Sequence, residues 1–323
     1  MKAIVHDRFG SPEVLELREI AAPGVGDGDV LVRVHAASVN PADWYAMTGT
    51  PYVARPQMGL RKPKGNGPGL DLAGEVTAVG GNVTRFRPGD EVFGAGTGTL
   101  AEYVAASEDG LVLKPANLSF EQAAAVPVAG LTALQGLRDK GRVQPGQQVL
   151  INGASGGVGT FAVQVAKALG AEVTAVCSTR NLDMVASLGA DRVVDYTRED
   201  FTRTDRRYDL LLDVAGSRSW PECRRVLTPQ ATLVLVGAPK GNALLGPVRH
   251  ILKVRLASLR ASQKVVFFIS KLDRQDLEAL RELLEAGKVT PVVERTYPLS
   301  EAADAFRHLG AGHARGKLAI SMR

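Results

Sequence analysis

A chain of 323 residues with 45% hydrophobic and 23% charged residues has the composition of a soluble globular protein with room for two domains. No run approaches the ~18 apolar residues of a membrane span, and we expect no signal peptide at the charged start, MKAIVHDRFG. Two cysteines, Cys177 and Cys223, are too few for a disulfide framework or a zinc cluster. We therefore expect both to be buried, in a reducing cytoplasm, and a net charge of +5 gives no reason to expect nucleic acid as a partner.

Residues 1–115 contain short apolar runs separated by Gly, Pro, Asp and Asn, a spacing typical of a barrel or sandwich. The segment 51–69 interrupts this pattern with four prolines and several basic residues. It is either a solvated surface loop or a flap over a ligand. Strands are expected at Lys2–His6, Leu15–Ile20, Val30–His35, Gly74–Val79, Glu91–Gly94, Ala101–Ala105 and Leu111–Lys114.

Alternating helices and strands follow. Ser119 and Gln122 form a capping box, which predicts a long helix through about Lys140. Six apolar strands with mostly helical connections then predict a doubly wound parallel sheet. The elements after Asp273 exceed what that sheet needs, so we expect this tail to return to the first domain. The six strands are expected at Val149–Asn152, Val173–Cys177, Arg192–Asp195, Asp209–Asp213, Thr232–Val236 and Val265–Ile269.

The turn Gly153–Gly159, GASGGVG, carries the most specific signal. It contains A-x-G-x-x-G, the dinucleotide fingerprint with alanine in its first glycine place, between an apolar strand and an amphipathic helix. Small residues let a pyrophosphate approach the backbone, where the N–H groups and dipole of the helix start hold its negative charge. We therefore predict a dinucleotide site formed by Ala154, Ser155, Gly156, Gly157, Val158 and Gly159.

The same turn also matches G-x-S-x-G, the nucleophile elbow of hydrolases, with Ser155 as the nucleophile. However, no HGGG-type oxyanion segment precedes it, and the only upstream histidines are His6 and His35. An elbow also gives Gly159 no role. We therefore disfavour a hydrolase.

Several short motifs are spread in order along nearly the whole chain. They are Val39–Tyr45, Gly69–Gly74, Pro88–Val92, Ala101–Val104, Ala124–Pro127 with Thr132, the A-x-G-x-x-G turn, Asp213–Gly216 and Arg315–Lys317. Together they resemble the medium-chain dehydrogenase/reductase superfamily, and within it the zinc-independent quinone-oxidoreductase branch. The resemblance implies a GroES-like β-barrel catalytic domain, 1–122 completed by 271–323. It also implies a Rossmann dinucleotide-binding domain with the doubly wound parallel sheet, 123–270.

The departures from that superfamily concern metal. Its zinc alcohol dehydrogenases carry a cysteine at or near position 40, a His-Glu pair at positions 70–71 and a structural cysteine cluster. This chain has Asn40, Leu70 and Asp71 there, and no cluster. Without such ligands no Lewis acid polarises an alcohol oxygen, so we expect no bound metal and disfavour alcohol oxidation. Reduction of an electron-poor acceptor, a quinone or an enone, depends less on such polarisation.

The end of the second predicted strand bears on the choice of cofactor. An NAD site has an acidic residue about 20 residues past the fingerprint. Here Ser178, Thr179 and Arg180 take that place, and a guanidinium suits a 2′-phosphate. By resemblance, Tyr196 also lies against this phosphate. We therefore predict NADPH as the cofactor. The alternative for Arg180 is a solvated residue at the start of a helix.

The resemblance places Asn40 and Tyr45 at the nicotinamide as catalytic residues, and Thr132 near its carboxamide. Tyr45 either donates a proton or hydrogen bond to the acceptor or holds Asn40 and its loop in place, since water can protonate a quinol. Asp43 and Tyr52 are further polar candidates. The remaining cofactor contacts implied by the resemblance are Ala215, Gly237, Phe268 and Lys317.

Two surface features complete the predictions. Residues 240–271 contain seven basic residues, no acidic residue and many leucines, a basic amphipathic pattern. We favour a helical excursion with its apolar side inward over contact with a lipid surface or a lipophilic or anionic acceptor. Branch members commonly pair through their dinucleotide domains, and the apolar strand Val265–Phe268 would be an edge needing cover. We therefore expect a homodimer.

The function expected from these features is NADPH-dependent, zinc-independent hydride transfer to a quinone or an activated double bond of a small electrophilic acceptor. One alternative is an enoyl-thioester reductase of the same superfamily. Another is a protein that binds NADPH without turnover, as a sensor or structural component.

Overall fold

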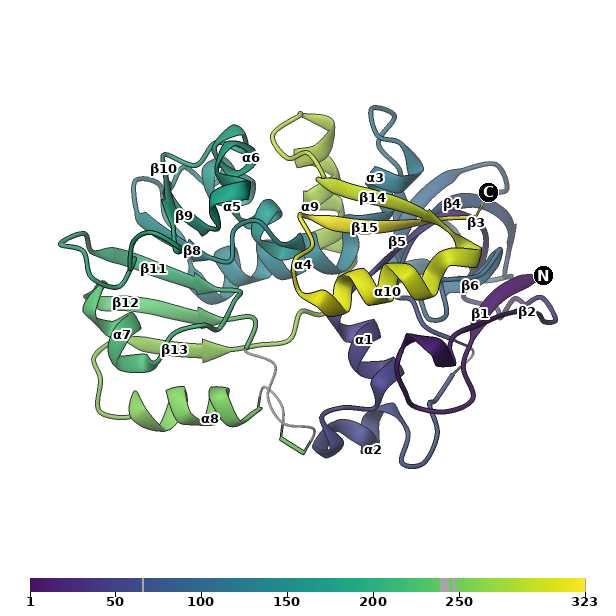
Figure 1. The fold of residues 1–323 in the computed structure, drawn as a ribbon. Coiled ribbons are helices and arrows are strands. Elements are labelled where there is room, and N and C mark those ends of the chain that lie inside the picture. The colour runs from purple at the N-terminus through teal and green to yellow at the C-terminus, as the bar shows by residue number, and fades with distance from the viewer. Residues whose placement is uncertain (66, 239–243, 246–247, 323) are drawn as a thin grey trace. The chain divides into compact units, whose positions relative to one another are not determined.

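The computed structural model describes residues 1–65, 67–238, 244–245 and 248–322, and the chain divides into two compact units (Figure 1). Unit 1 comprises Met1–Leu131, Leu272–Ala286 and Pro291–Arg323, and unit 2 comprises Thr132–Lys271 and Gly287–Thr290. The change of unit falls after Leu131 rather than after residue 122, because the helix at Phe120–Ala124 packs against the strands of unit 1.

Unit 1 is built on a mainly antiparallel sheet ordered β14-β15-β3-β4-β5-β7, with β6 also paired to β3, and β1 and β2 form a separate pair. One edge of β3 pairs with β4; its other edge pairs with β6 in its first half and with β15 in its second. The strands are β1 (Lys2–Val5), β2 (Glu16–Glu19), β3 (Asp29–Val39), β4 (Asp71–Val79), β5 (Glu91–Ala95), β6 (Tyr103–Ser107), β7 (Leu111–Leu113), β14 (Val293–Pro298) and β15 (Lys317–Ser321).

β3 extends to Val39, well past the predicted end at His35, because its second half pairs with a strand from the far end of the chain. Helices cover the sheet, and α10 is packed against it through the fully buried Phe306. The helical segments are η1 (Pro12–Val14), α1 (Pro41–Thr48), η2 (Tyr52–Ala54), α2 (Arg55–Met58), η3 (Glu108–Gly110), α3 (Phe120–Ala124), α9 (Arg274–Glu285), η6 (Leu299–Glu301) and α10 (Ala302–Ala311).

Unit 2 is a six-stranded, all-parallel sheet ordered β10-β9-β8-β11-β12-β13, the doubly wound order 3-2-1-4-5-6 (Figure 1). This confirms the predicted sheet, and both cysteines are buried and free, as predicted. The strands are β8 (Gln148–Asn152), β9 (Glu172–Cys177), β10 (Arg192–Asp195), β11 (Tyr208–Asp213), β12 (Leu227–Leu235) and β13 (Lys264–Phe267). The helical segments are η4 (Gln135–Gly141), α5 (Gly157–Ala168), η5 (Thr179–Asn181), α6 (Leu182–Ser187), α7 (Trp220–Arg225) and α8 (Val248–Ala257).

The long helix predicted from Ser119 to about Lys140 is wrong. The capping box forms, with the Gln122 N–H donating to Ser119 Oγ at 3.2 Å, but α3 ends at Ala124. Pro127 lacks an N–H group and disfavours the helical conformation of the residue before it, so the chain breaks there. A second helix, α4 (Pro127–Leu134), follows and runs into the π-helical η4.

The helix expected within residues 240–271 forms as α8, but the expectation that its apolar side turns inward is wrong for the leucines. In α8 the only buried side chain is Val254. Leu252 and Leu256 are 52% and 65% exposed, and Leu259 just after the helix is 74% exposed. Lys240 lies outside the described residues.

Candidate functional site

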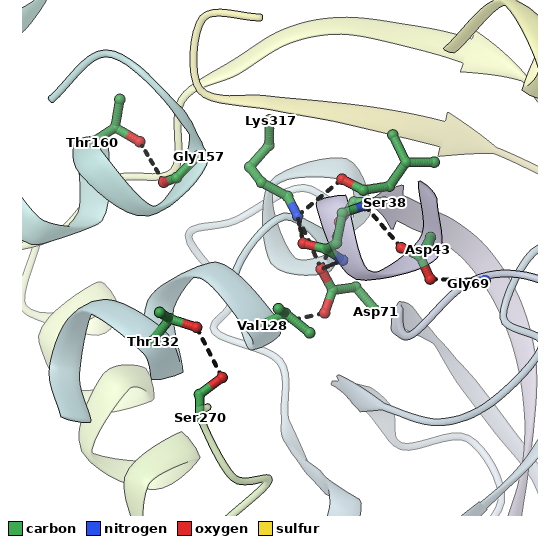
Figure 2. A network of polar contacts seen from close by, with 12 residues as sticks. Ser38, Asp43, Gly69, Asp71, Val128, Thr132, Gly157, Thr160, Ser270 and Lys317 are labelled. Atoms are coloured by element: carbon green, nitrogen blue, oxygen red, sulfur yellow. Dashed lines mark hydrogen bonds and ion pairs between the residues drawn. The ribbon is translucent and has the colours of Figure 1, made fainter. Parts of the chain in front are cut away.

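A buried lysine lies at the centre of the polar cluster of unit 1 (Figure 2). Lys317, at the start of β15, is 3% exposed, and its Nζ donates to Asn40 Oδ1, to Asp71 Oδ2 at 3.1 Å and to the Val39 carbonyl at 3.3 Å. Strand register brings these residues together, because β3 pairs with β15 on one side and with β4, which begins at Asp71, on the other. All three ammonium protons therefore have acceptors.

The carboxylate of Asp71 is fully buried and hydrogen-bonded at both oxygens. Besides Lys317, its Oδ2 accepts from Ser38 Oγ at 2.7 Å and Asn40 Nδ2 at 2.8 Å, and its Oδ1 accepts from the Val128 N–H at 2.9 Å. Both side-chain atoms of Asn40 are thus bound within the network, and the residue is 2% exposed. Asn40 is held as part of the framework, and its predicted contact with the nicotinamide stays a prediction.

The resemblance to zinc dehydrogenases puts their metal ligands at or near Asn40 and Asp71, two residues of this network. In this structure the Lys317 ammonium already neutralises the Asp71 carboxylate and is also bound to Asn40. A second cation there would be repelled by the ammonium, and no cysteine or histidine supplies a softer ligand. Within the described ranges, no group of three or more His, Cys, Asp or Glu side chains is placed to hold a metal ion. These residues do not fit a tetrahedral zinc site.

Asp43, next to the network on α1, is a second buried carboxyl that the sequence marked only as a polar candidate. Its Oδ2 accepts from the Asn40 N–H at 2.8 Å and its Oδ1 from the Gly69 N–H at 3.1 Å. Burial, followed by the neighbouring Asp71 carboxylate, raises the pKa of Asp43 to about 7. Asp43 therefore ties the start of α1 to the end of the segment 51–69.

The predicted catalytic residue Tyr45 also lies on α1 and is half-buried. Burial raises the pKa of its phenol above the ordinary value, so the hydroxyl keeps its proton at neutral pH. Its hydroxyl makes no hydrogen bond with any other described residue, whereas Lys317 and Asp71 both hydrogen-bond to the Asn40 side chain. The role of Tyr45 stays a prediction.

The segment 51–69 contains η2 and α2 and is bonded largely to its own surroundings. Arg55 Nε donates to the Gly49 carbonyl at 3.0 Å, and its guanidinium stacks over Tyr52 at 4.4 Å. Lys64 Nζ donates to the Pro56 carbonyl at 3.1 Å. Two of its cations thus support its own fold, and whether it closes over a ligand stays open.

In unit 2 the glycine turn has the form that the fingerprint requires. Gly153 has φ of +91°, a backbone conformation that favours glycine, so it is a needed turn residue that the fingerprint pattern left out. A Cβ on Gly159 would lie 2.1 Å from the Gly153 carbonyl oxygen, which explains the last glycine. A Cβ on Gly156 would meet only that same oxygen, at 3.8 Å, so the N-terminus of α5 lies open to a phosphate. The turn therefore fits a pyrophosphate.

The end of β9 holds the residues predicted to read the 2′-phosphate, and beside them a carboxylate that the sequence did not reveal. Asp195 ends β10 and pairs in register with Cys177. Thr179 donates its only hydroxyl proton to Asp195 Oδ2 at 2.5 Å, and this hydrogen bond is the main cause that lowers the pKa of Asp195. Thr179 in this rotamer cannot donate to a phosphate. Arg198 lies 3.5 Å from Asp195 and offsets its charge.

Arg180 and Tyr196 lie on the surface at this end of the sheet, Tyr196 with 53% of its area exposed, and Ser178 is half-buried. Arg198, 74% exposed in its side chain, was not predicted as a cofactor residue. Its position two residues after Tyr196 could have suggested it. Two guanidinium groups thus lie at this end of the sheet, together with one partly neutralised carboxylate.

The neighbouring strands β8 and β11 end in Asn152 and Asp213, at the point where the strand order reverses. Asn152 Nδ2 and the Gly216 N–H both donate to Asp213 Oδ1 at 2.8 Å, while Asp213 Oδ2 is buried with no partner among the described residues. Burial raises the pKa of Asp213 to about 6. In doubly wound sheets this reversal point is where ligands bind.

The predicted contacts Ala215 and Gly237 follow the ends of β11 and β12. Gly237 could not be another residue, since a Cβ there would lie 1.9 Å from the Val214 carbonyl oxygen. Thr132 Oγ1 donates to Ser270 Oγ at 2.9 Å, so Ser270 is a neighbour that the sequence did not reveal (Figure 2). The Phe268 ring lies near Gly136 of η4.

Together, the sheet order and the open glycine turn define a two-domain dinucleotide-binding protein with a separate β domain. The comparison with known families agrees. Residues 26–116 match the alcohol dehydrogenase GroES-like domain, and residues 188–320 match the family described as zinc-binding dehydrogenase.

Relatives matched over the whole chain narrow the family. The mouse mitochondrial NAD(P)H oxidoreductase RTN4IP1 is 35% identical, over 100% of this chain and 89% of its own length. The chloroplastic quinone-oxidoreductase QR1 of Triphysaria versicolor is 33% identical, over 99% and 98%. The 2-methylene-furan-3-one reductase of Solanum lycopersicum is 34% identical, over 99% and 79%.

Solved structures give the same result. The quinone oxidoreductase from Coxiella burnetii superposes with a TM-score of 0.88 at 34% identity, covering 100% of this chain and 99% of that one. The Escherichia coli quinone oxidoreductase complexed with NADPH gives 0.84 at 26% identity, covering 99% and 100%. The chain belongs to the medium-chain dehydrogenase/reductase superfamily, in its quinone-oxidoreductase-like branch. The resemblance drawn from the sequence is thereby confirmed.

Proposed function

We propose that this protein is an NADPH-dependent reductase that reduces a quinone or an α,β-unsaturated carbonyl without zinc. The single observation that carries the proposal is the ammonium of Lys317 bound to Asp71 and Asn40. That network includes Asn40 and Asp71, where the resemblance would put metal ligands, and the dinucleotide turn keeps the form needed for a cofactor. NADPH, when bound, would supply the hydride.

On the cofactor side, the N-terminus of α5 binds the pyrophosphate through its free N–H groups. Ser178, Arg180 and Tyr196 bind the 2′-phosphate, and Arg198 adds a second guanidinium. Thr179 acts indirectly, because its hydroxyl is committed to Asp195. The NADPH-bound Escherichia coli relative supports this choice of cofactor.

On the acceptor side, Tyr45 has a protonated hydroxyl that makes no hydrogen bond within the described part of the chain, so it donates to the carbonyl oxygen that gains negative charge during reduction. Lys317 and Asp71 keep Asn40 and the start of α1 in place. No Lewis acid is needed, because a conjugated carbonyl is already electron-poor. Two relatives are named for a quinone and for a conjugated methylene-furanone, which share that acceptor chemistry.

The proposal is tested with a panel of acceptors and NADPH, followed through loss of the reduced-nicotinamide absorbance. The panel contains a water-soluble quinone, a cyclic enone, a crotonyl thioester and, with NADP⁺, a primary alcohol. We expect turnover with the quinone and the enone. Turnover confined to the thioester would identify an enoyl reductase, and tight NADPH binding without any turnover would identify a sensor.

Tyr45→Phe refines the test. General acid catalysis typically contributes about 10²–10⁴-fold, so the variant should lose about a hundredfold in enone reduction. Quinone reduction should fall less, because water protonates a quinol. Equal, small losses with both acceptors would show that Tyr45 takes no part in the chemistry.

Assembly as a homodimer and a cytoplasmic location remain part of the proposal.

A further inference from the structure

The outward side of α8 and of the turn after it presents leucines and cations together. We infer that this surface docks on an anionic lipid membrane. We call it the basic leucine face and define it by Leu252, Leu256, Leu259, Lys253, Arg255 and Arg260, all of which are exposed. The inference does not depend on the proposed function.

Helix geometry places two of the leucines on one side. Residues four apart lie on the same side of a helix, so Leu252 and Leu256 lie together on α8, and Leu259 adds a third exposed leucine in the turn that follows. Val254 points to the opposite side, where it is 3% exposed and belongs to the core of unit 2 with Trp220. The helix therefore packs on the core of unit 2 through Val254, and the three leucines remain exposed.

The cations flank these leucines without counter-ions. Lys253 lies on one side of the helical pair and Arg255 on the other, and Arg260 follows the last leucine. None of the three forms an ion pair within the described part of the chain, and no acidic residue occurs between Glu222 and Asp273 in the sequence. The face therefore carries an uncompensated positive charge around apolar side chains.

A lipid surface is the partner that uses both properties. An interfacial helix inserts its apolar row at the headgroup level while lysine and arginine meet anionic headgroups. The face lies on the surface rather than spanning, since none of the helices in the described ranges is long and apolar enough to cross a membrane. Nucleic acid would leave three exposed leucines unused. A second copy docked through the same face would bring like charges together, which is unfavourable.

Co-sedimentation of the whole protein with vesicles tests the inference. The vesicles are phosphatidylcholine alone or phosphatidylcholine mixed with phosphatidylglycerol. We expect binding only to the mixed vesicles and release by high salt. Each cation near an anionic surface contributes about 1 kcal/mol, so replacing Lys253, Arg255 and Arg260 together with glutamine should weaken binding about a hundredfold.

Matched control variants distinguish binding through this face from effects of net charge and from nonspecific hydrophobic binding. Arg8, Arg87 and Lys288 are exposed cations elsewhere, and their triple glutamine variant has the same charge change. Leu252, Leu256 and Leu259 replaced with glutamine should weaken binding at least tenfold. Glutamine at the exposed Leu17, Leu60 and Leu113 should not weaken it.

Three results would overturn the inference. One is equal binding to neutral and anionic vesicles. Another is an equal loss in the face and control cation variants, which would reduce the effect to net charge. The third is a wild-type dimer that the leucine-face variant converts to a monomer, which would make a second copy the occupant.

Discussion

Replacing Lys317 with methionine removes the counter-ion of a carboxylate that has no solvent contact. Lys317 and Asp71 are 3% and 0% exposed, and their charged atoms lie 3.1 Å apart. Breaking a buried pair by removing one partner costs about 3–5 kcal/mol. Ser38, Asn40 and the Val128 N–H still donate to Asp71, so we expect the lower end, about 3 kcal/mol.

The assay is denaturant unfolding followed by the fluorescence of Trp44, which lies in unit 1. The other tryptophan, Trp220, lies in unit 2 and is replaced with phenylalanine in all samples. Adding Asp71→Asn to Lys317→Met removes the orphaned charge and should recover at least half of the lost stability. A loss below about 0.5 kcal/mol for Lys317→Met, within the range of ordinary surface changes, would refute the buried pair.

Four further predictions follow from the same structure. Arg180→Ala should weaken NADPH binding about tenfold and NADH binding little. Ser178→Asp should further narrow the preference for NADPH over NADH. Both variants are measured by fluorescence titration, and equal losses for both cofactors would show that the phosphate site is misplaced. Because the folded-state pKa of Asp43 is raised to about 7, the folded chain keeps a proton that the unfolded chain releases, so stability should fall as pH rises from 5 to 7. Asp43→Asn should reduce this pH-dependent loss of stability by up to about 2 kcal/mol, measured by denaturant titration at each pH. An unchanged dependence of stability on pH would argue against the raised pKa of Asp43. Elemental analysis should find no stoichiometric zinc, and chelators should leave activity unchanged, because Lys317 occupies the cation position. Light scattering at micromolar concentration should give a dimer mass, since β13 is an edge strand of its sheet with Phe267 42% exposed; a monomer mass would count against pairing there.

The parts of the fold that could be predicted from the sequence are those encoded locally. Each strand of unit 2 is a short apolar run, and the glycine turn lies between a strand and a helix, so pattern and spacing suffice. The break at Pro127 is also encoded locally, because proline lacks the N–H group that a helix interior needs and disfavours a helical residue before it. The capping box at Ser119 indicates where a helix begins and not where it ends.

The unpredicted parts depend on contacts between distant residues. Lys317 and Asp71 are 246 positions apart and meet only because β15 and β4 flank the same strand. Asp195 meets Thr179 only through the pairing of β10 with β9. The outward leucines of α8 have the same composition as a buried face, and only the packing of Val254 shows which side faces the core.

The central claim is that hydride passes from NADPH to a conjugated carbonyl without a metal. The most direct measurement uses NADPH carrying deuterium at the transferable position, a cyclic enone, and protein shown by elemental analysis to be free of zinc. We predict a saturated ketone with deuterium on the carbon β to the carbonyl, located by NMR. Deuterium on the carbonyl carbon of an alcohol product, or turnover that appears only when zinc is added, would contradict the claim.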